Sequence, residues 1–216
     1  MIIKTFVEPP IENNNYLLID EETYEAALID CSFPDIWEKI PKEKGTVTST
    51  PTGNDRGEVD NVLLKYILLT HGHFDHIGGI QDSKIPVYMH KNDMNIVQSV
   101  NQYMPMFGMP SIVVPKVDKF IEDGEIIKLG SLEIKVIHTP GHTQGSVCYL
   151  VNDVLFSGDT IFRESVGRCD LEGGDFDRLV DSIETKIYTL PEETQIYSGH
   201  GKPTNVGWEK LHNQFL

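Results

Sequence analysis

Three histidines and an aspartate lie within one short stretch of the chain, directly after an apolar run. The stretch reads Thr-His-Gly-His-Phe-Asp-His, and its candidate ligands are His71, His73, Asp75 and His76. On an extended backbone the first three side chains alternate to one side, and a turn can bring the fourth round. Histidine and aspartate are ligands of borderline metal ions, and free polar groups between Leu69 and Ile77 would be costly to bury. The spacing therefore predicts a site for two divalent metal ions, with a solvated histidine-rich loop as the alternative.

Three further candidate ligands lie beside glycines at the predicted ends of strands. They are His142 after Gly141, Asp159 after Gly158, and His200 between Gly199 and Gly201. Each has a simpler interpretation, because a lone histidine in a turn is usually structural and an aspartate there can cap a helix or form a turn. Loops at strand ends are, however, also where open sites gather their functional residues. Three such positions, added to the first cluster, favour a metal site built from several loops.

These loops must be positioned by strands that end close together. Short apolar runs predict strands at residues 2–7, 16–19, 26–29, 66–69, 87–90, 126–129, 132–137, 147–151, 154–157 and 196–197. Apolar spacing and composition predict helices at residues 34–40, 91–100, 176–187 and 205–214. A long exposed loop is expected at residues 41–61, and an irregular apolar segment at 101–116. Consecutive strands argue against an alternating βαβ sheet and favour two packed sheets with helices outside.

The four motifs, in their order and spacing, resemble the metallo-β-lactamase superfamily. The matching segments are residues 70–79, 139–143, 157–160 and 199–201, and the resemblance covers nearly the whole chain outside 41–61. It implies an α+β fold, a four-layer αββα sandwich of two mixed sheets with helices outside and the metals at one edge. It also implies that His71, His73 and His142 hold one ion, that Asp75, His76 and His200 hold the second, and that Asp159 bridges the two.

Residues 158–162 and 166–171 are similar to the glyoxalase II-like branch of this superfamily, in a short form without a C-terminal helical domain. The resemblance implies a hydroxyacylglutathione hydrolase-like thioesterase, in which a hydroxide held between the two ions attacks S-lactoylglutathione or a related thioester. Asp75 is expected either to bind metal only or to bind metal and also take up a proton as the intermediate collapses. Arg168 is expected either to clamp a substrate carboxylate or to pair with a nearby acidic side chain. Zinc is the expected metal, with iron and manganese as alternatives.

Two other functions fit parts of the same pattern. A persulfide dioxygenase of this fold would hold one iron with His71, His142 and Asp159. A non-catalytic metal-binding protein is the other alternative, although a full set of ligand candidates favours an enzyme. A β-lactamase is less expected because no secretory signal is recognised.

Length, net charge and cysteine content indicate the number of domains, the kind of partner and the cellular compartment to expect. The 216 residues suit a single domain, residues 1–216, with a loop insertion at about 41–61. The formal net charge of −15 disfavours nucleic-acid binding, and no apolar run is long enough to cross a membrane. The three cysteines lack metal or disulfide spacing, which is typical of a reducing compartment. A cytoplasmic enzyme with a small-molecule substrate is therefore expected, and its oligomeric state is left open.

Overall fold

The computed structural model describes residues 1–9, 11–41, 62–81 and 83–216, and its strands form two six-stranded sheets and a two-stranded ribbon. The first sheet contains, in spatial order, β1 (Ile2–Glu8), β2 (Asn13–Ile19), β3 (Glu25–Ile29), β4 (Leu63–Leu68), β5 (Val87–His90) and β6 (Lys119–Ile121). The second contains β14 (Thr204–Asn205), β13 (Gln195–Ser198), β10 (Val154–Gly158), β9 (Val147–Val151), β8 (Leu132–His138) and β7 (Ile126–Leu129). The ribbon pairs β11 (Ile161–Phe162) with β12 (Ser165–Val166). Both large sheets mix parallel and antiparallel pairs.

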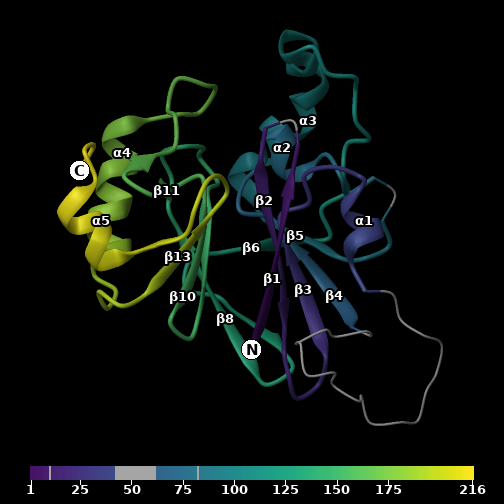
Figure 1. Cartoon of the computed structure of the whole chain (residues 1–216). Coiled ribbons are helices and arrows are strands. Elements are labelled where there is room, and N and C mark those ends of the chain that lie inside the picture. Colours follow the sequence, from purple (N-terminus) through teal and green to yellow (C-terminus); the bar gives the residue numbers. More distant parts are fainter. Residues whose placement is uncertain (10, 42–61, 82) are drawn as a thin grey trace.

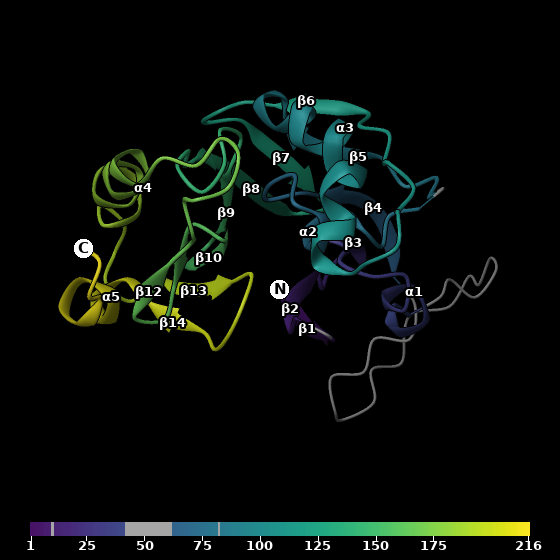
Figure 2. The same ribbon diagram turned by 90° about the horizontal axis from the view of Figure 1, so that it is seen from above.

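The helices cover the outer faces of the two sheets (Figure 1). They are α1 (Ile36–Lys39), α2 (Phe74–Ile77), α3 (Met94–Tyr103), α4 (Phe176–Ser182) and α5 (Val206–His212), with 3₁₀ turns at Lys91–Asp93 and Met104–Phe107 and a π-helical turn at Ile183–Ile187. Seen from above, α4 and α5 lie outside the second sheet, and α1 to α3 lie outside the first (Figure 2). The predicted α+β, four-layer αββα sandwich is confirmed.

Three apolar clusters fill the spaces between these layers. Leu17 and Ile19 of β2 pack with the helices of the first sheet, whereas the alternate residues Tyr16 and Leu18 pack against the second sheet. This alternation is the two-residue period of a strand that is buried on both faces. A third cluster joins the second sheet to α4 and α5 through residues such as Leu179.

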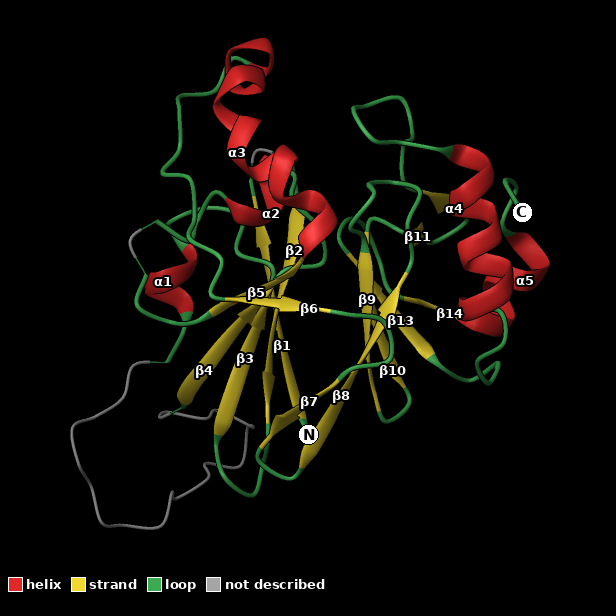
Figure 3. Ribbon diagram, turned by 180° about the vertical axis from the view of Figure 1, so that it is seen from behind, coloured by secondary structure: helices red, strands yellow, loops and turns green. Residues whose placement is uncertain are grey.

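Most predicted elements are present, with differences at their ends (Figure 3). The prediction of an irregular segment at 101–116 is wrong for its first residues, because α3 runs to Tyr103 and a 3₁₀ turn follows it. The last turn of the helix predicted at 176–187 is π-helical. The loop predicted at 41–61 lies, apart from residue 41, outside the described residues and stays a prediction. No helix of the described ranges combines the length and the hydropathy that crossing a membrane needs.

The ligand-bearing loops emerge at one shared edge of the sandwich. Residues 70–76 follow β4 of the first sheet, whereas His142, Asp159 and His200 follow β8, β10 and β13 of the second. Backbone hydrogen bonds join the sheets at this edge: the N–H of Val147 donates to the Thr70 carbonyl at 2.8 Å, and that of Asn14 to the Gly199 carbonyl at 2.7 Å. The two sheets together therefore fix the relative positions of the loops.

Candidate metal centre

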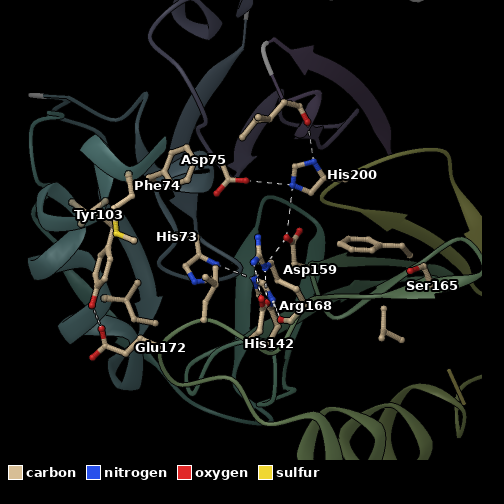
Figure 4. A pocket seen from close by; sticks show the side chains of 18 residues that line it. His73, Phe74, Asp75, Tyr103, His142, Asp159, Ser165, Arg168, Glu172 and His200 are labelled. Carbon is tan, nitrogen blue, oxygen red and sulfur yellow. Dashed lines mark hydrogen bonds and ion pairs between the residues drawn. The ribbon is translucent and has the colours of Figure 1, made fainter. Parts of the chain in front are cut away.

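The seven predicted ligands converge at this edge, and Figure 4 shows five of them around one pocket. Their ligand atoms form three groups, each within 4.8 Å: His71 with His73 and His142, His71 with His76 and Asp159, and Asp75 with His76 and His200. The first and third groups coincide with the two sets that the family resemblance implies. Asp159 lies between them, with Oδ2 3.7 Å from Nε2 of both His142 and His200.

The outer ring nitrogens of His142 and His76 are bonded to acceptors. Nδ1 of His142 lies 2.7 Å from the Arg168 carbonyl, and Nδ1 of His76 lies 2.8 Å from Oδ2 of Asp30. A carbonyl or carboxylate oxygen can only accept, so each Nδ1 must carry the proton. In a neutral ring Nε2 then carries a lone pair, and that of His142 faces the centre of the site, whereas Nε2 of His76 lies 3.0 Å from the side-chain amide nitrogen of Asn13.

The same arrangement holds for His200 and His71. Nδ1 of His200 lies 3.2 Å from the Ile11 carbonyl, which can only accept its proton. Nδ1 of His71 lies 3.1 Å from Oγ1 of Thr70, and that hydroxyl donates its own proton to Asp30 at 2.8 Å. The Thr70 oxygen is therefore an acceptor for His71, and Nε2 of His71 is left unprotonated. Nε2 of His200 lies 3.3 Å from Oδ2 of Asp75, and this carboxylate and that of Asp159 raise the pKa of His200 despite its burial.

The Nε2 lone pairs of His71 and His142 face each other at short range. Nε2 of His71 and Nε2 of His142 are 3.1 Å apart, and Nδ1 of His73 is 3.1 Å from the first and 2.9 Å from the second. Two acceptor nitrogens at this distance repel unless a positive charge lies between them. A divalent ion supplies that charge, so the donor set fits a metal.

Burial keeps His71 and His73 neutral. The pKa of His71 is lowered well below its ordinary value by burial, and neighbouring imidazoles lower it further. Burial and the nearby ring of His142 lower the pKa of His73 to about 3. Neutral imidazole is the form that binds metal, so these side chains need to lose no proton near neutral pH.

The carboxylates dominate the other side of the site. Burial works against charge on His76, but the carboxylates of Asp30, Asp159 and Asp75 raise its pKa well above the ordinary value. Burial likewise opposes charge on Asp159, and His76 more than offsets this effect and holds the pKa of Asp159 below its usual range. Among the described residues, the buried Oδ1 of Asp159 has no hydrogen-bond partner. Nε2 of His76 lies 3.4 Å from this oxygen, and a buried carboxylate oxygen without a hydrogen bond suits a metal ligand.

The chain passes close to the site at Gly199. A Cβ there would lie 2.2 Å from Oδ1 of Asp159 and 2.9 Å from Cε1 of His76. No side chain fits in that space, which accounts for the glycine before His200.

Sequence reasoning missed two buried aspartates that hold the ligand loops. Asp30 follows β3 and accepts from the backbone N–H of Thr70 at 2.8 Å, in addition to its bond with His76. Asp93 accepts from the N–H of Gly72 at 2.9 Å, the N–H of Gly145 at 2.6 Å and the Thr143 hydroxyl at 2.7 Å. Asp93 thus joins the loops that carry His71 and His73 to the loop that carries His142.

The side chain of Arg168 forms a two-pronged ion pair. Its Nε lies 2.6 Å from Oδ1 of Asp170 and its Nη2 lies 2.8 Å from Oδ2. This pair was one of the two predicted roles. Arg168 also lines the pocket, so its second predicted role, binding a substrate carboxylate, would require it to exchange Asp170 for the substrate.

The three remaining histidines lie away from the centre. His90 and His138 stack with ring centroids 4.1 Å apart, and His212 stacks on Trp208 at 4.0 Å.

A family model of the metallo-β-lactamase superfamily matches residues 10–200. The chain belongs to the metallo-β-lactamase superfamily. One curated relative is the probable metallo-hydrolase YqgX of Bacillus subtilis, which is 43% identical over 159 residues, 69% of this chain and 74% of that protein. Another is the hydroxyacylglutathione hydrolase GloC of Haemophilus influenzae, 34% identical over 87% of this chain and 92% of that protein.

Solved structures of superfamily members share the fold. The B3 metallo-β-lactamase BLEG-1 superimposes with a TM-score of 0.81 at 33% identity, covering 100% of this chain and 99% of its own. The protein TTHA1623, solved in a di-iron-bound form, superimposes with a TM-score of 0.80 at 30% identity, and the match covers 99% of this chain and 100% of that protein.

Proposed function

We propose that this chain is a dinuclear metal-dependent hydrolase that cleaves thioesters, with S-lactoylglutathione or a similar compound as substrate. The observation that carries the proposal is the pair of unprotonated Nε2 atoms of His71 and His142, which lie 3.1 Å apart beside Asp159, whose Oδ1 has no hydrogen-bond partner among the described residues. The name of the GloC relative supports the substrate class.

In this proposal each ion takes three ligands of its own and shares Asp159. One set is His71, His73 and His142, and the other is Asp75, His76 and His200. Bound metal would supply positive charge that lowers the pKa of water and stabilises negative charge on a carbonyl oxygen. Zinc suits this donor set, and the di-iron form of TTHA1623 keeps iron, like manganese, among the alternatives.

The side chains hold and orient the reactants. Asp75 lines the pocket, with Oδ2 3.3 Å from Nε2 of His200, and its carboxylate can accept a proton as the thiolate departs. A thiolate is a good leaving group, so the reaction requires no strong general acid. Outer contacts such as that of His142 with the Arg168 carbonyl fix the ring orientations before substrate binds.

The test combines metal analysis with a panel of thioesters. We expect two ions per chain in metal-loaded protein and hydrolysis of S-lactoylglutathione, with Asp159→Asn reducing both. Asp153→Asn, in the exposed turn between β9 and β10, is the matched control and should change neither. One ion per chain at any metal supply would contradict the dinuclear site. Persulfide-dependent oxygen consumption without thioester hydrolysis would instead support a dioxygenase.

A further inference from the structure

The cavity above the candidate metal centre extends well beyond the ligands. Its volume is about 610 Å³, within the usual range for small-molecule sites of roughly 300–1,000 Å³. One wall comes from α2, α3 and the 3₁₀ turn after α3, and the other from residues 162–172. For a thioester with a short acyl group, the thiol arm is the larger part of the substrate. This arm must therefore occupy the space beyond the centre.

The lining of this outer space is mainly apolar. Ile96, Val100 and Met106 contribute to one wall, and Val166 and Leu171 contribute to the other. Apolar lining of this kind stabilises a ligand by removing apolar surface from water.

The charged groups of the outer space carry a net negative charge. Apart from the predicted metal ligands, the charged lining residues within the described part of the chain are Arg168, Asp170 and Glu172. The guanidinium of Arg168 is already held by both carboxylate oxygens of Asp170, so it has little positive charge to offer. Glu172 adds an uncompensated carboxylate, and the three groups sum formally to −1.

The position of Glu172 is fixed by a contact across the cavity. Its Oε2 accepts a hydrogen bond from the hydroxyl of Tyr103, a residue of α3. Figure 4 shows this pair on the side of the pocket opposite His200. The carboxylate is therefore held at the outer end of the cavity, where the far end of a thiol arm would lie.

We propose that this cavity selects thioesters whose thiol arm is apolar and carries no negative charge at its outer end, with Asp170 and Glu172 acting as the residues that disfavour anionic arms. The proposal rests on the thioesterase function proposed above and refines its substrate class. The glutathione arm carries two carboxylates and one ammonium group and is therefore a net anion, so its thioesters would bind less tightly than neutral thioesters of the same acyl group.

The test measures binding with two thioethers that cannot be hydrolysed. S-Hexylglutathione, which is anionic, and S-hexyl-N-acetylcysteamine, which is neutral, share the alkyl chain but differ in the size as well as the charge of the other arm. The change in their Kd ratio in the variants therefore isolates the effect of charge. Titration calorimetry on metal-loaded protein should give a Kd for the neutral compound at least about fivefold lower than that for the anionic one. Glu172→Gln should reduce this ratio about threefold, because a carboxylate at the cavity mouth raises the free energy of a nearby anion. Asp170→Asn should reduce it as well, since it also frees Arg168.

The control is Glu184→Gln, which removes the same charge from an exposed position outside the cavity. It should leave the ratio of the two Kd values unchanged. Tighter binding of the glutathione compound, or a ratio that Glu172→Gln does not alter, would overturn the proposal. Hydrolysis of the thioesters that correspond to the two thioethers is measured separately. Failure to cleave both thioesters would overturn the proposed thioesterase function. The ratio of the two Kd values would still decide the charge preference of the cavity.

Discussion

Asp93 is the residue whose replacement tests most directly how the ligand loops are held. It is fully buried, and its two oxygens divide their contacts. Oδ1 accepts from the N–H of Gly145, whereas Oδ2 accepts from the N–H of Gly72 and from the Thr143 hydroxyl. Asp93→Ala would leave both backbone donors buried without a partner. Asp93→Asn can keep the contacts of Oδ2 and lose only that of Oδ1.

The expected magnitudes follow from this count. A buried donor left unsatisfied costs about 1–3 kcal/mol, so two such donors correspond to about 2–6 kcal/mol. Burial raises the pKa of Asp93 despite its hydrogen bonds, which shows that the buried charge is itself unfavourable and reduces the net loss. We therefore expect Asp93→Ala to lower the free energy of unfolding by about 2–4 kcal/mol and Asp93→Asn by about 1–2 kcal/mol.

The assay is urea unfolding of metal-free protein, paired with metal affinity measured against a chromophoric chelator. Loss of a residue that orients ligands typically lowers metal affinity by about 10- to 100-fold, and both variants should show such a loss. Asp35→Asn, an exposed carboxylate without a side-chain capping bond, is the control and should change neither quantity. Unfolding midpoints and metal affinities equal to those of the parent in Asp93→Ala would refute the reasoning.

Three further predictions address other parts of the molecule. Asp159→Ala should remove at least one ion per chain, because it deletes the carboxylate between the two ligand groups; metal analysis by mass spectrometry checks this. Arg168→Ala should change the free energy of unfolding by less than about 1 kcal/mol, since its pair with Asp170 is exposed. It should also raise KM for an anionic thioester with little change in kcat, because it leaves the charges of Asp170 and Glu172 in the cavity without a counter-charge. Burial, helped by His138, lowers the pKa of His90 to about 4, so folding favours its neutral form and the protein loses stability as pH falls below about 6.5 towards 4. His90→Gln should lose less stability than the parent over that pH range, as measured by urea unfolding.

The parts of the site that sequence predicted are those that are encoded locally. The cluster at residues 70–76 and the glycine-flanked positions of His142 and His200 are visible as residue types beside apolar runs. The same runs predicted most strands and hence the two-sheet architecture. That all seven side chains would meet came from the family resemblance, because the spacing of separate motifs does not specify a shared edge.

The two supporting aspartates could not be predicted because their partners are distant in sequence. Asp30 contacts Thr70 across 40 positions, and Asp93 contacts Gly145 across 52. Asp30 did carry a usable signal, since it follows a buried apolar strand as Asp159 does. Asp93 lies between a 3₁₀ turn and α3, where an aspartate suggests only a helix cap. Nothing in the sequence around Asp93 indicates that it contacts the loop that carries His142.

The hydrogen bonds around the imidazoles explain why the ligands need such an extensive support. Each neutral ring can point an unprotonated nitrogen inward only if its other nitrogen donates outward, and the outward acceptors here come from different parts of the chain. Asp30 accepts a hydrogen bond from His76, the Arg168 carbonyl accepts one from His142, and the Ile11 carbonyl accepts one from His200. The resulting cluster of lone pairs and carboxylates is unfavourable by itself, so its energy must be offset by folding. The same arrangement then costs little further reorganisation when cations bind, and this preorganisation is what a tight dinuclear site requires.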